Sequence, residues 1–261
     1  MGCKIEVLFT PAELRELPQR ELGDAVCVVF DVLRATSTMI TALANGAAAF
    51  IPAEEISEAL MRHRQQPDAL LAGERHGLRI GADLTGGVEF DFGNSPREFT
   101  AGKVAGRTII STTTNGTRAL RACARAESAV AGSFLNLQAT ADFVAAKKPN
   151  HLLLVCAGTR DYAALEDTLA AGALCDRLIA STAAVELRDS AEIALRVYRH
   201  AESDLPAAVR SAQNARQLLA NADLSDDVAF CLRRDCYDLT AALGPDGVVR
   251  MSSAPAAPFG S

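Results

Sequence analysis

The alternation of short apolar runs with segments of helical spacing is the feature that most constrains the fold of this chain. The apolar runs have the length and composition of buried strands and cover residues 5–9, 26–30, 48–51, 69–72, 108–110, 129–131 and 152–156. Helical spacing of apolar residues is found between them, in residues 38–44, 54–64, 117–125, 137–147 and 165–180. Strands that alternate with helices form βαβ units, whose sheet is covered on both faces. The sequence therefore predicts an α/β protein with a three-layer α/β/α architecture and a mostly parallel or mixed sheet.

The remainder of the chain adds helices and one strand. Residues 191–238 have mostly helical patterns, and residues 248–251 resemble a last strand. We interpret residues 1–251 as a single α/β domain, with a division into two subdomains near 125–150 as the alternative. Residues 252–261 are rich in Ser, Pro and Ala and are expected to form a frayed C-terminal tail.

Charge and composition narrow the classes of partner. The chain of 261 residues has a formal net charge of −6 and lacks the clustered Lys and Arg that bind nucleic acid, whereas a small anion needs only a local group of cations. Its seven Cys show no Cys-x-x-Cys spacing, which is typical of reduced thiols in a cytoplasmic protein. Glu6 and Pro11 interrupt any signal-peptide core, and no apolar run is long enough to span a membrane. We expect a cytoplasmic protein with a small anionic ligand, no nucleic-acid or membrane partner, and a homodimer as an open alternative.

Asp31 comes directly after the apolar run 26–30, and ligands of open α/β sheets bind at the carboxyl ends of strands. A carboxylate in this place can bind Mg²⁺ or attack phosphorus, or it can do no more than cap the next helix. Arg34 can hold two phosphate oxygens at once. The helix that follows opens with three hydroxyl residues, one of which we expect at the N-cap of an anion-binding helix start: Thr36, Ser37 and Thr38.

A second turn, residues 111–118, repeats this pattern after the strand at 108–110. A helix is expected to start near Thr117. A helix cap needs only one hydroxyl, so the excess of hydroxyl residues in this turn favours an oxyanion cradle. The candidate substrate-binding residues of the turn are Thr113, Thr114, Asn115, Gly116, Thr117 and Arg118.

Two pairs of charged residues follow other strands. Glu74 and Arg75 come just after residues 69–72, and we take Glu74 as a catalytic and Arg75 as a substrate-binding candidate. Glu166 and Asp167 stand at the start of a predicted helix. They either favour the helix dipole and do nothing else, or complete a metal site, because Mg²⁺ prefers one or two carboxylates plus waters.

The segment around Ser95 has both a local and a functional interpretation. Ser95 and Glu98 have the spacing of a capping box, and Pro96 occupies the expected first helical position. Asp91 and Asn94 precede them and are the candidates for a metal ligand and a substrate contact.

These motifs together resemble the 2-phosphosulfolactate phosphatase family, and they occur in the order typical of that family over roughly residues 5–180. The resemblance implies Mg²⁺-dependent hydrolysis of 2-phospho-3-sulfolactate to sulfolactate and phosphate, a step toward coenzyme M. The loop between Arg75 and Asp91 looks longer than is usual in the family, so a related small phospho-acid is the alternative substrate. The segments that carry the resemblance are 31–38, 73–75, 92–98, 111–118, 156–158 and 166–167.

The resemblance implies three groups of site residues. The catalytic group is Asp31, Arg34 and Glu74, and the metal group is Asp31, Asp91, Glu166 and Asp167. The substrate-binding group comprises Thr36, Ser37, Thr38, Arg75, Asn94, Ser95, Thr113, Thr114, Asn115, Gly116, Thr117 and Arg118.

Two other functions stay open at this point. The segment from Arg75 to Arg79 matches the start of the histidine-phosphatase signature, with His76 as the nucleophile and His200 in a second motif, although Gly81 stands where that signature has Pro. A non-catalytic anion-binding protein is the other alternative. The C-x₅-R cradle, the D-x-D pair and the P-loop are all missing from the sequence.

Overall fold

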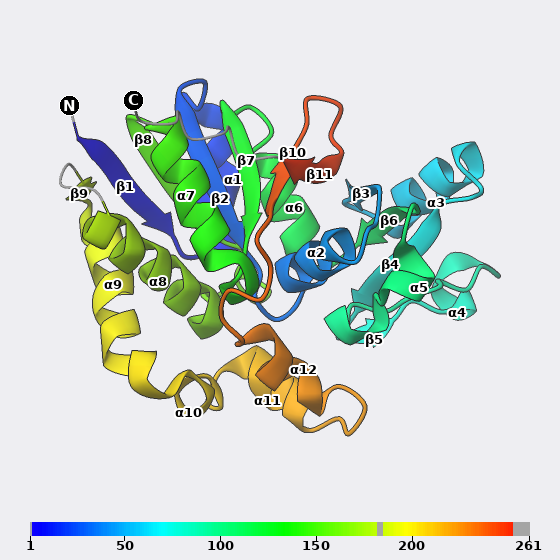
Figure 1. Cartoon of the computed structure of the whole chain (residues 1–261). Helices are drawn as coiled ribbons and strands as arrows, with labels where there is room; N and C mark the ends of the chain where they lie inside the picture. Colours follow the sequence, from blue (N-terminus) through cyan, green and yellow to red (C-terminus); the bar gives the residue numbers. More distant parts are fainter. Residues whose placement is uncertain (1, 182–184, 253–261) are drawn as a thin grey trace.

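The computed structural model describes residues 2–181 and 185–252 (Figure 1). Its strands form one mixed sheet of eleven strands, in the order β5-β4-β6-β3-β11-β10-β7-β2-β8-β1-β9. The predicted three-layer α/β architecture is confirmed. The strands are β1 (Cys3–Leu8), β2 (Ala25–Phe30), β3 (Ala49–Ala53), β4 (Leu70–Arg75), β5 (Leu78–Arg79), β6 (Thr108–Thr112), β7 (Ser128–Gly132), β8 (His151–Cys156), β9 (Val185–Leu187), β10 (Thr240–Leu243) and β11 (Val249–Ser252).

The helices cover both faces of the sheet and close one of its ends. Short 3₁₀ turns lie at Leu17–Gln19, Pro96–Glu98, Phe134–Asn136 and Glu202–Asp204. The α-helices are α1 (Pro11–Glu16), α2 (Ala35–Ala44), α3 (Ile56–Gln65), α4 (Ala82–Thr85), α5 (Ala101–Val104), α6 (Gly116–Ala122), α7 (Leu137–Lys147), α8 (Leu165–Ser181), α9 (Asp189–Ala201), α10 (Leu205–Val209), α11 (Gln213–Leu219) and α12 (Ser225–Cys231).

Strand β2 shows why the sequence produces a covered sheet. Every residue of this strand is buried. Side chains alternate between the two faces of a strand, and accordingly Val26 and Val28 belong to the core beneath α7, α8 and α9. Cys27 and Val29 belong to the core on the opposite face, with residues of α2 and α6. A strand that is apolar at every position can be stable only when helices cover both faces.

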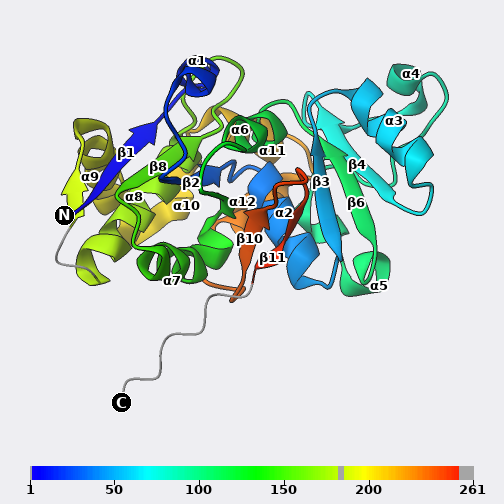
Figure 2. The same cartoon turned by 90° about the horizontal axis from the view of Figure 1, so that it is seen from above.

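Two parallel blocks, a hairpin and the short edge strand β5, which pairs antiparallel with β4, make up the sheet. One contains β4, β6 and β3, the other β7, β2, β8, β1 and β9, and the antiparallel hairpin β10–β11 joins them. In the view from above, this hairpin and α2 lie between the two blocks (Figure 2). Three successive antiparallel pairings separate β3 from β7, so the blocks run in opposite senses. The carboxyl ends of β2 and β6 therefore approach each other only because the sheet twists, by about 20–25° per strand pair.

The C-terminal helices position one wall of the site. Helices α10 to α12 lie below the sheet in Figure 1, and residues of α11 and of the start of α12 face the carboxyl ends of the strands. The prediction of a mostly helical segment at 191–238 is confirmed, and so is the last strand, as β11. The tail predicted at 252–261 lies outside the described residues except for Ser252, which ends β11.

Two predictions about helix starts were wrong. Helix α2 begins at Ala35, so Thr36, Ser37 and Thr38 lie inside the helix and none is its N-cap. The Asp31 carboxylate closes this turn instead, by accepting a hydrogen bond of 3.0 Å from the Ala35 N–H. Asp31, four residues before Ala35, thus accepts the hydrogen bond at the helix start that the sequence pattern assigned to a hydroxyl residue.

The capping box predicted at Ser95 and Glu98 does not form. No side-chain cap bond is present at the start of this 3₁₀ turn, although Pro96 does occupy its first position. The Glu98 carboxylate accepts a hydrogen bond from the Gly93 N–H at 3.0 Å, which leaves the Ser95 hydroxyl available to a distant partner.

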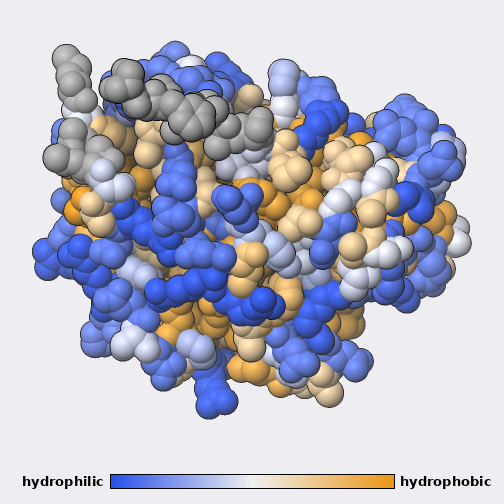
Figure 3. Space-filling view, in the orientation of Figure 1, coloured by the Kyte–Doolittle hydropathy of each residue, from blue (hydrophilic) through white to orange (hydrophobic). Residues whose placement is uncertain are grey.

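The outer surface is mostly hydrophilic in the orientation of Figure 3, with apolar residues in smaller groups among the polar ones. Within residues 2–181 and 185–252, none of the helices combines the length and apolar character needed to cross a membrane.

Candidate active site

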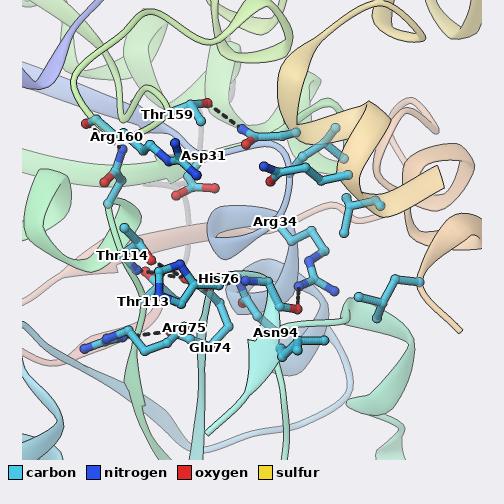
Figure 4. A pocket seen from close by; sticks show the side chains of 18 of the residues that line it. Asp31, Arg34, Glu74, Arg75, His76, Asn94, Thr113, Thr114, Thr159 and Arg160 are labelled. Atoms are coloured by element: carbon cyan, nitrogen blue, oxygen red, sulfur yellow. Dashed lines mark hydrogen bonds between the residues drawn. The ribbon is translucent and has the colours of Figure 1, made fainter. Parts of the chain in front are cut away.

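A cavity of about 460 Å³ lies where β2, β4, β6 and β8 end, a size typical of sites for small ligands (Figure 4). In Figure 4, Asp31, Thr159 and Arg160 lie on one side, with Glu74 and Arg75 opposite. The lining residues come from segments far apart in the sequence: Asp31, Leu33, Arg34, Glu74, Arg75, His76, Gly77, Leu78, Asn94, Thr113, Thr114, Asn115, Gly158, Thr159, Arg160, Asn214, Gln217, Leu218, Asn221 and Leu224.

The carboxylate of Asp31 is held at the wall of this cavity. The backbone N–H of Asp31 donates to Thr36 Oγ1 at 3.1 Å, and the carboxylate oxygen Oδ1 accepts from the Ala35 N–H. Gly116, at the start of α6, lies so close that a Cβ atom built on it would be 2.5 Å from Asp31 Oδ2. Only glycine allows this approach. Burial raises the pKa of Asp31 to about 7, and the negative charges of Glu74 and Glu166 act in the same direction.

Asp167 is buried behind Asp31 and joins two loops of the site. Its Oδ1 accepts from the Val32 N–H at 2.8 Å, and its Oδ2 accepts from the Gly158 N–H at 3.2 Å. The turn after β2 is thereby tied to the loop after β8. Burial raises the pKa of Asp167 well above its ordinary value, and the charges of Glu166 and Asp31 raise it further.

Glu166 is buried beside this cluster with half of its carboxylate unused. Its Oε1 accepts from Asn214 Nδ2 at 2.7 Å, and burial raises the pKa of this group. Its Oε2 is buried and has no hydrogen-bond partner among the described residues. An unsatisfied buried oxygen next to other carboxylates is the kind of position that a cation or a water fills.

The donor set fits Mg²⁺ better than an ion with an all-protein cage. The described residues contain no group of three or more His, Cys, Asp or Glu arranged to hold a metal. Mg²⁺ keeps several waters and needs only one or two carboxylates, so Asp31 and the free Glu166 Oε2 fit its requirements. Glu166 is not itself a lining residue, but it is bonded to Asn214, which is. Asp91 does not join them, because its Oδ2 accepts from the Leu71 N–H at 2.8 Å and Leu71 does not line the cavity.

Arg34 is buried and fully engaged. Its Nη1 donates to Asp227 Oδ2 at 2.8 Å, and its Nη2 donates to the Gly77 carbonyl at 2.8 Å. Asp227 also accepts from the Ser95 hydroxyl at 2.6 Å and from Arg97 Nε at 2.7 Å. Sequence reasoning missed Asp227, since an acid in the first turn of a helix is usually explained by the helix dipole. This carboxylate connects α12 to two walls of the cavity.

Both carboxylate oxygens of Glu74 accept hydrogen bonds from residues that line the cavity. Its Oε1 accepts from both the N–H and the hydroxyl of Thr114 at 2.9 Å, and its Oε2 accepts from the Gly77 N–H at 2.8 Å. His76 and Gly77 form a two-residue hairpin turn with φ of 57° and 81°. Glu74 therefore ties this hairpin to the turn after β6.

Arg75 brings a positive charge to the cavity without a carboxylate to neutralise it. Its guanidinium donates to the Glu74 carbonyl at 2.7 Å and to Thr112 Oγ1 at 3.0 Å. Burial lowers the pKa of Arg75 from its ordinary value, as expected for a cation taken out of water.

The other predicted substrate-binding residues divide into two groups. Asn94, Thr113, Thr114 and Asn115 line the cavity, and Gly116 and Thr117 lie directly behind them. Those that do not line it are Thr36, Ser37 and Thr38, which bond inside the protein, Ser95, which bonds Asp227, and Arg118, which pairs with Glu55 at 2.5 Å.

Several lining residues were not predicted. Thr159 and Arg160 are the third and fourth residues after the predicted strand at 152–156, so the strand-end rule that gave Asp31 could have found them. Asn214 comes from α11 and bonds both Thr159 Oγ1 and Glu166 Oε1 at 2.7 Å, for which the sequence carries no signal. His76 lines the cavity, whereas His200 does not, so the second histidine-phosphatase motif is not assembled.

Comparison with known proteins agrees with this geometry. The family model described as 2-phosphosulpholactate phosphatase matches residues 11–244. The chain belongs to the 2-phosphosulfolactate phosphatase family. Curated relatives of this family are named probable 2-phosphosulfolactate phosphatase, and the name is that of a phosphoric monoester hydrolase. The protein of Caldicellulosiruptor saccharolyticus is 37% identical over 88% of this chain and 94% of its own length.

Two further members of the 2-phosphosulfolactate phosphatase family are equally similar. The protein of Caldanaerobacter subterraneus is 38% identical over 94% of this chain and 98% of its own length. That of Thermotoga maritima is 38% identical over 83% of this chain and 88% of its own length. The family resemblance drawn from the motifs is thus confirmed over nearly the whole chain.

Proposed function

We propose that this protein is a Mg²⁺-dependent phosphatase that hydrolyses 2-phospho-3-sulfolactate, or a closely related small phospho-acid, to sulfolactate and phosphate. One observation carries the proposal. The Asp31 carboxylate, whose pKa is raised to about 7, faces a cavity that also presents the guanidinium groups of Arg34, Arg75 and Arg160. A carboxylate in the same cavity as these cations has no use in a site that only binds anions.

The charges of the cavity suit a substrate with several anionic groups. A 2-phospho-3-sulfolactate molecule carries a phosphate, a sulfonate and a carboxylate. Asp227 compensates the charge of Arg34, whereas Arg75 and Arg160 have no carboxylate partner in the described structure. These two arginines supply the positive charge that such a substrate requires, in the fork geometry that suits phosphate and sulfonate oxygens.

Hydrolysis needs a nucleophile at phosphorus and stabilisation of the equatorial oxygens. We propose that Asp31 is either the nucleophile or a ligand of the metal, and both roles use its position beside the cavity. Bound Mg²⁺ would polarise the phosphoryl group, and Asp31 and Glu166 are the residues that would hold it. Thr113 offers its hydroxyl group to the oxygens of the transferred group, whereas both donors of Thr114 are bound to Glu74. Overall, water gives its oxygen to phosphorus and a proton to the leaving sulfolactate oxygen.

A panel of phospho-acids assayed with Mg²⁺ and with EDTA tests this proposal. We expect phosphate release from 2-phospho-3-sulfolactate at the highest kcat/KM of the panel, and loss of activity in EDTA that added Mg²⁺ restores. Activity that persists in EDTA and disappears in His76→Ala would support a histidine-type phosphatase instead. Binding of sulfolactate without hydrolysis of any panel member would support a non-catalytic anion-binding protein.

A further inference from the structure

A second cavity lies on the other side of the wall formed by Asn115 and the loop after β8. It has a volume of about 490 Å³ and lies beside α1 and α6. Apolar side chains such as Leu14 and Ala122 form part of its lining. Arginines dominate the rest of the lining, and they come from three separate segments of the chain: Arg15, Arg118, Arg121, Arg125 and Arg160.

The arginines of this second cavity are not fully neutralised. Five arginines and only two carboxylates, Glu54 and Asp161, line it. With Glu55 and Glu58, which pair with Arg118 and Arg121 from outside the lining, five positive charges stand against four negative ones. Arg15 pairs with Asp161 at 3.1 Å, and Arg121 pairs with Glu54 at 3.2 Å. Surface pairs of this kind contribute about 0–1 kcal/mol each, so an incoming anion can replace the carboxylates at little cost.

Two of the five arginines have no acidic partner at all among the described residues. Arg125 donates only to the Pro18 carbonyl, at 2.9 Å. The Arg160 guanidinium makes no hydrogen bond or ion pair with any residue that the structure describes. A face that served only for solubility would pair or disperse these cations, whereas here they converge on a concave space.

The second cavity is physically coupled to the first. Asn115 and Arg160 line both cavities. Asn115 Nδ2 donates to the carbonyls of Ala157 at 3.1 Å and Gly158 at 2.9 Å, which fixes the loop from which Arg160 projects. The backbone of this loop is held tightly, while the guanidinium at its end is free. Arg160 is therefore the one described cation that can serve an anion on either side of the wall.

We propose that the second cavity is a binding site for a small anion with at least two negative charges, such as phosphate or a small phosphate ester, and that its occupation draws Arg160 away from the first cavity. The binding claim stands on the second cavity alone. The consequence for catalysis rests on the proposed phosphatase function, because an anion bound here removes one cation from the substrate and weakens its binding.

Calorimetric titration with inorganic phosphate at constant ionic strength tests the binding claim. The wild-type protein is expected to bind two phosphates per chain, one in each cavity. Arg125→Ala should lose the phosphate of the second cavity and retain that of the first. Arg75→Ala should lose the phosphate of the first cavity and retain that of the second. Arg250→Ala, which removes a surface arginine paired with Asp246, is the matched control and should still bind two. Arg118→Ala is the second variant of the cavity, and both variants replace exposed side chains.

The titration tests whether the second site exists, and the kinetics test whether it is coupled to the first cavity. A phosphate stoichiometry that neither Arg118→Ala nor Arg125→Ala lowers below that of the wild-type protein overturns the second site whatever the enzyme does. In the assay, phosphate inhibition of the wild-type enzyme should give a curved replot of slope against phosphate concentration, as expected when two phosphates act. In Arg125→Ala the replot should become linear with unchanged kcat, and a linear replot for the wild-type enzyme would contradict the coupling.

Discussion

The buried carboxylate of Asp227 holds the guanidinium of Arg34, with 2.8 Å between Asp227 Oδ2 and Arg34 Nη1. The two residues are separated by 193 positions in the sequence, and their side chains are 0% and 3% exposed. This pair attaches the C-terminal helices to the turn that carries Asp31. The wall of the cavity made by α11 and by the segment before α12 therefore depends on an ion pair that is shielded from water.

Removing the carboxylate of Asp227 should destabilise the protein strongly. Asp227→Ala leaves the charge of Arg34 buried and unpaired, which typically costs about 3–5 kcal/mol of unfolding free energy. Urea denaturation measures this loss. Asp226→Ala is the control, because the Asp226 side chain is 78% exposed and its ion pair with Arg97 is 3.4 Å long, so a change within about 0.5 kcal/mol is expected. Equal effects of the two substitutions would contradict the role given to Asp227.

Gly116→Ala should damage activity more than stability. The new methyl group would meet Asp31 Oδ2 and Ala35 Cβ, both 2.5 Å away, and would displace the carboxylate from the cavity. We expect a fall in kcat/KM of about 10²-fold, the order found when catalytic geometry is misplaced by 1 Å, with about 1–3 kcal/mol of destabilisation. Gly102→Ala, where no atom lies within 4 Å of the added Cβ, should change neither quantity. Normal kinetics for Gly116→Ala would show that Asp31 does not need its present position.

Mg²⁺ should stabilise the folded protein through Glu166. A ligand that binds only the folded state adds about 2.7 kcal/mol at a hundredfold excess over Kd, which raises Tm. Thermal unfolding with Mg²⁺ and with EDTA should show this rise in the wild-type protein and a much smaller one in Glu166→Gln. Asp91→Asn is the control and should respond like the wild-type protein, because the Asp91 carboxylate is bonded to Leu71 and not, as Glu166 is, to a residue that lines the cavity. An equal Mg²⁺ response in Glu166→Gln would remove Glu166 from the metal site.

Asp167 should make the metal-free protein less stable as the pH rises. Its pKa in the folded protein is raised well above the ordinary value near 4, chiefly by burial. A carboxyl with a raised folded pKa contributes stability that is fully present below the unfolded pKa and is lost as the pH rises toward the folded pKa. In EDTA, unfolding free energy measured from pH 4 upward should fall less steeply for Asp167→Asn than for the wild-type protein. Parallel curves would contradict this assignment.

The sequence predicted the residues whose position follows directly from a strand end. Asp31, Thr113 and Thr114 were found because the apolar runs before them end sharply, and all three line the cavity. Arg118 does not line this cavity, because the direction of a side chain on α6 depends on how that helix packs. Its guanidinium lies at the second cavity, away from Asp31.

The rest depended on long-range pairing that a single sequence does not display. Strand β10, which joins the two parallel blocks, has only four residues and few β-branched side chains, and its sequence predicted no element. In the sequence, Asp227 is an ordinary acid at a helix start. Its role follows only from the packing of α12 against the 3₁₀ turn that Ser95 precedes. Asn214 reaches Glu166 only through the fold of the C-terminal helices.

The most direct test of the account is the kcat/KM of Asp31→Asn for 2-phospho-3-sulfolactate in saturating Mg²⁺. The amide keeps the shape of the side chain but can neither attack phosphorus nor bind Mg²⁺ as a carboxylate does. We predict a fall of at least about 10³-fold, with a Tm in EDTA equal to or above that of the wild-type protein because a raised-pKa carboxyl has been replaced by a neutral group. An Asp31→Asn protein that folds and keeps wild-type kcat/KM would contradict the assignment of this cavity as the active site.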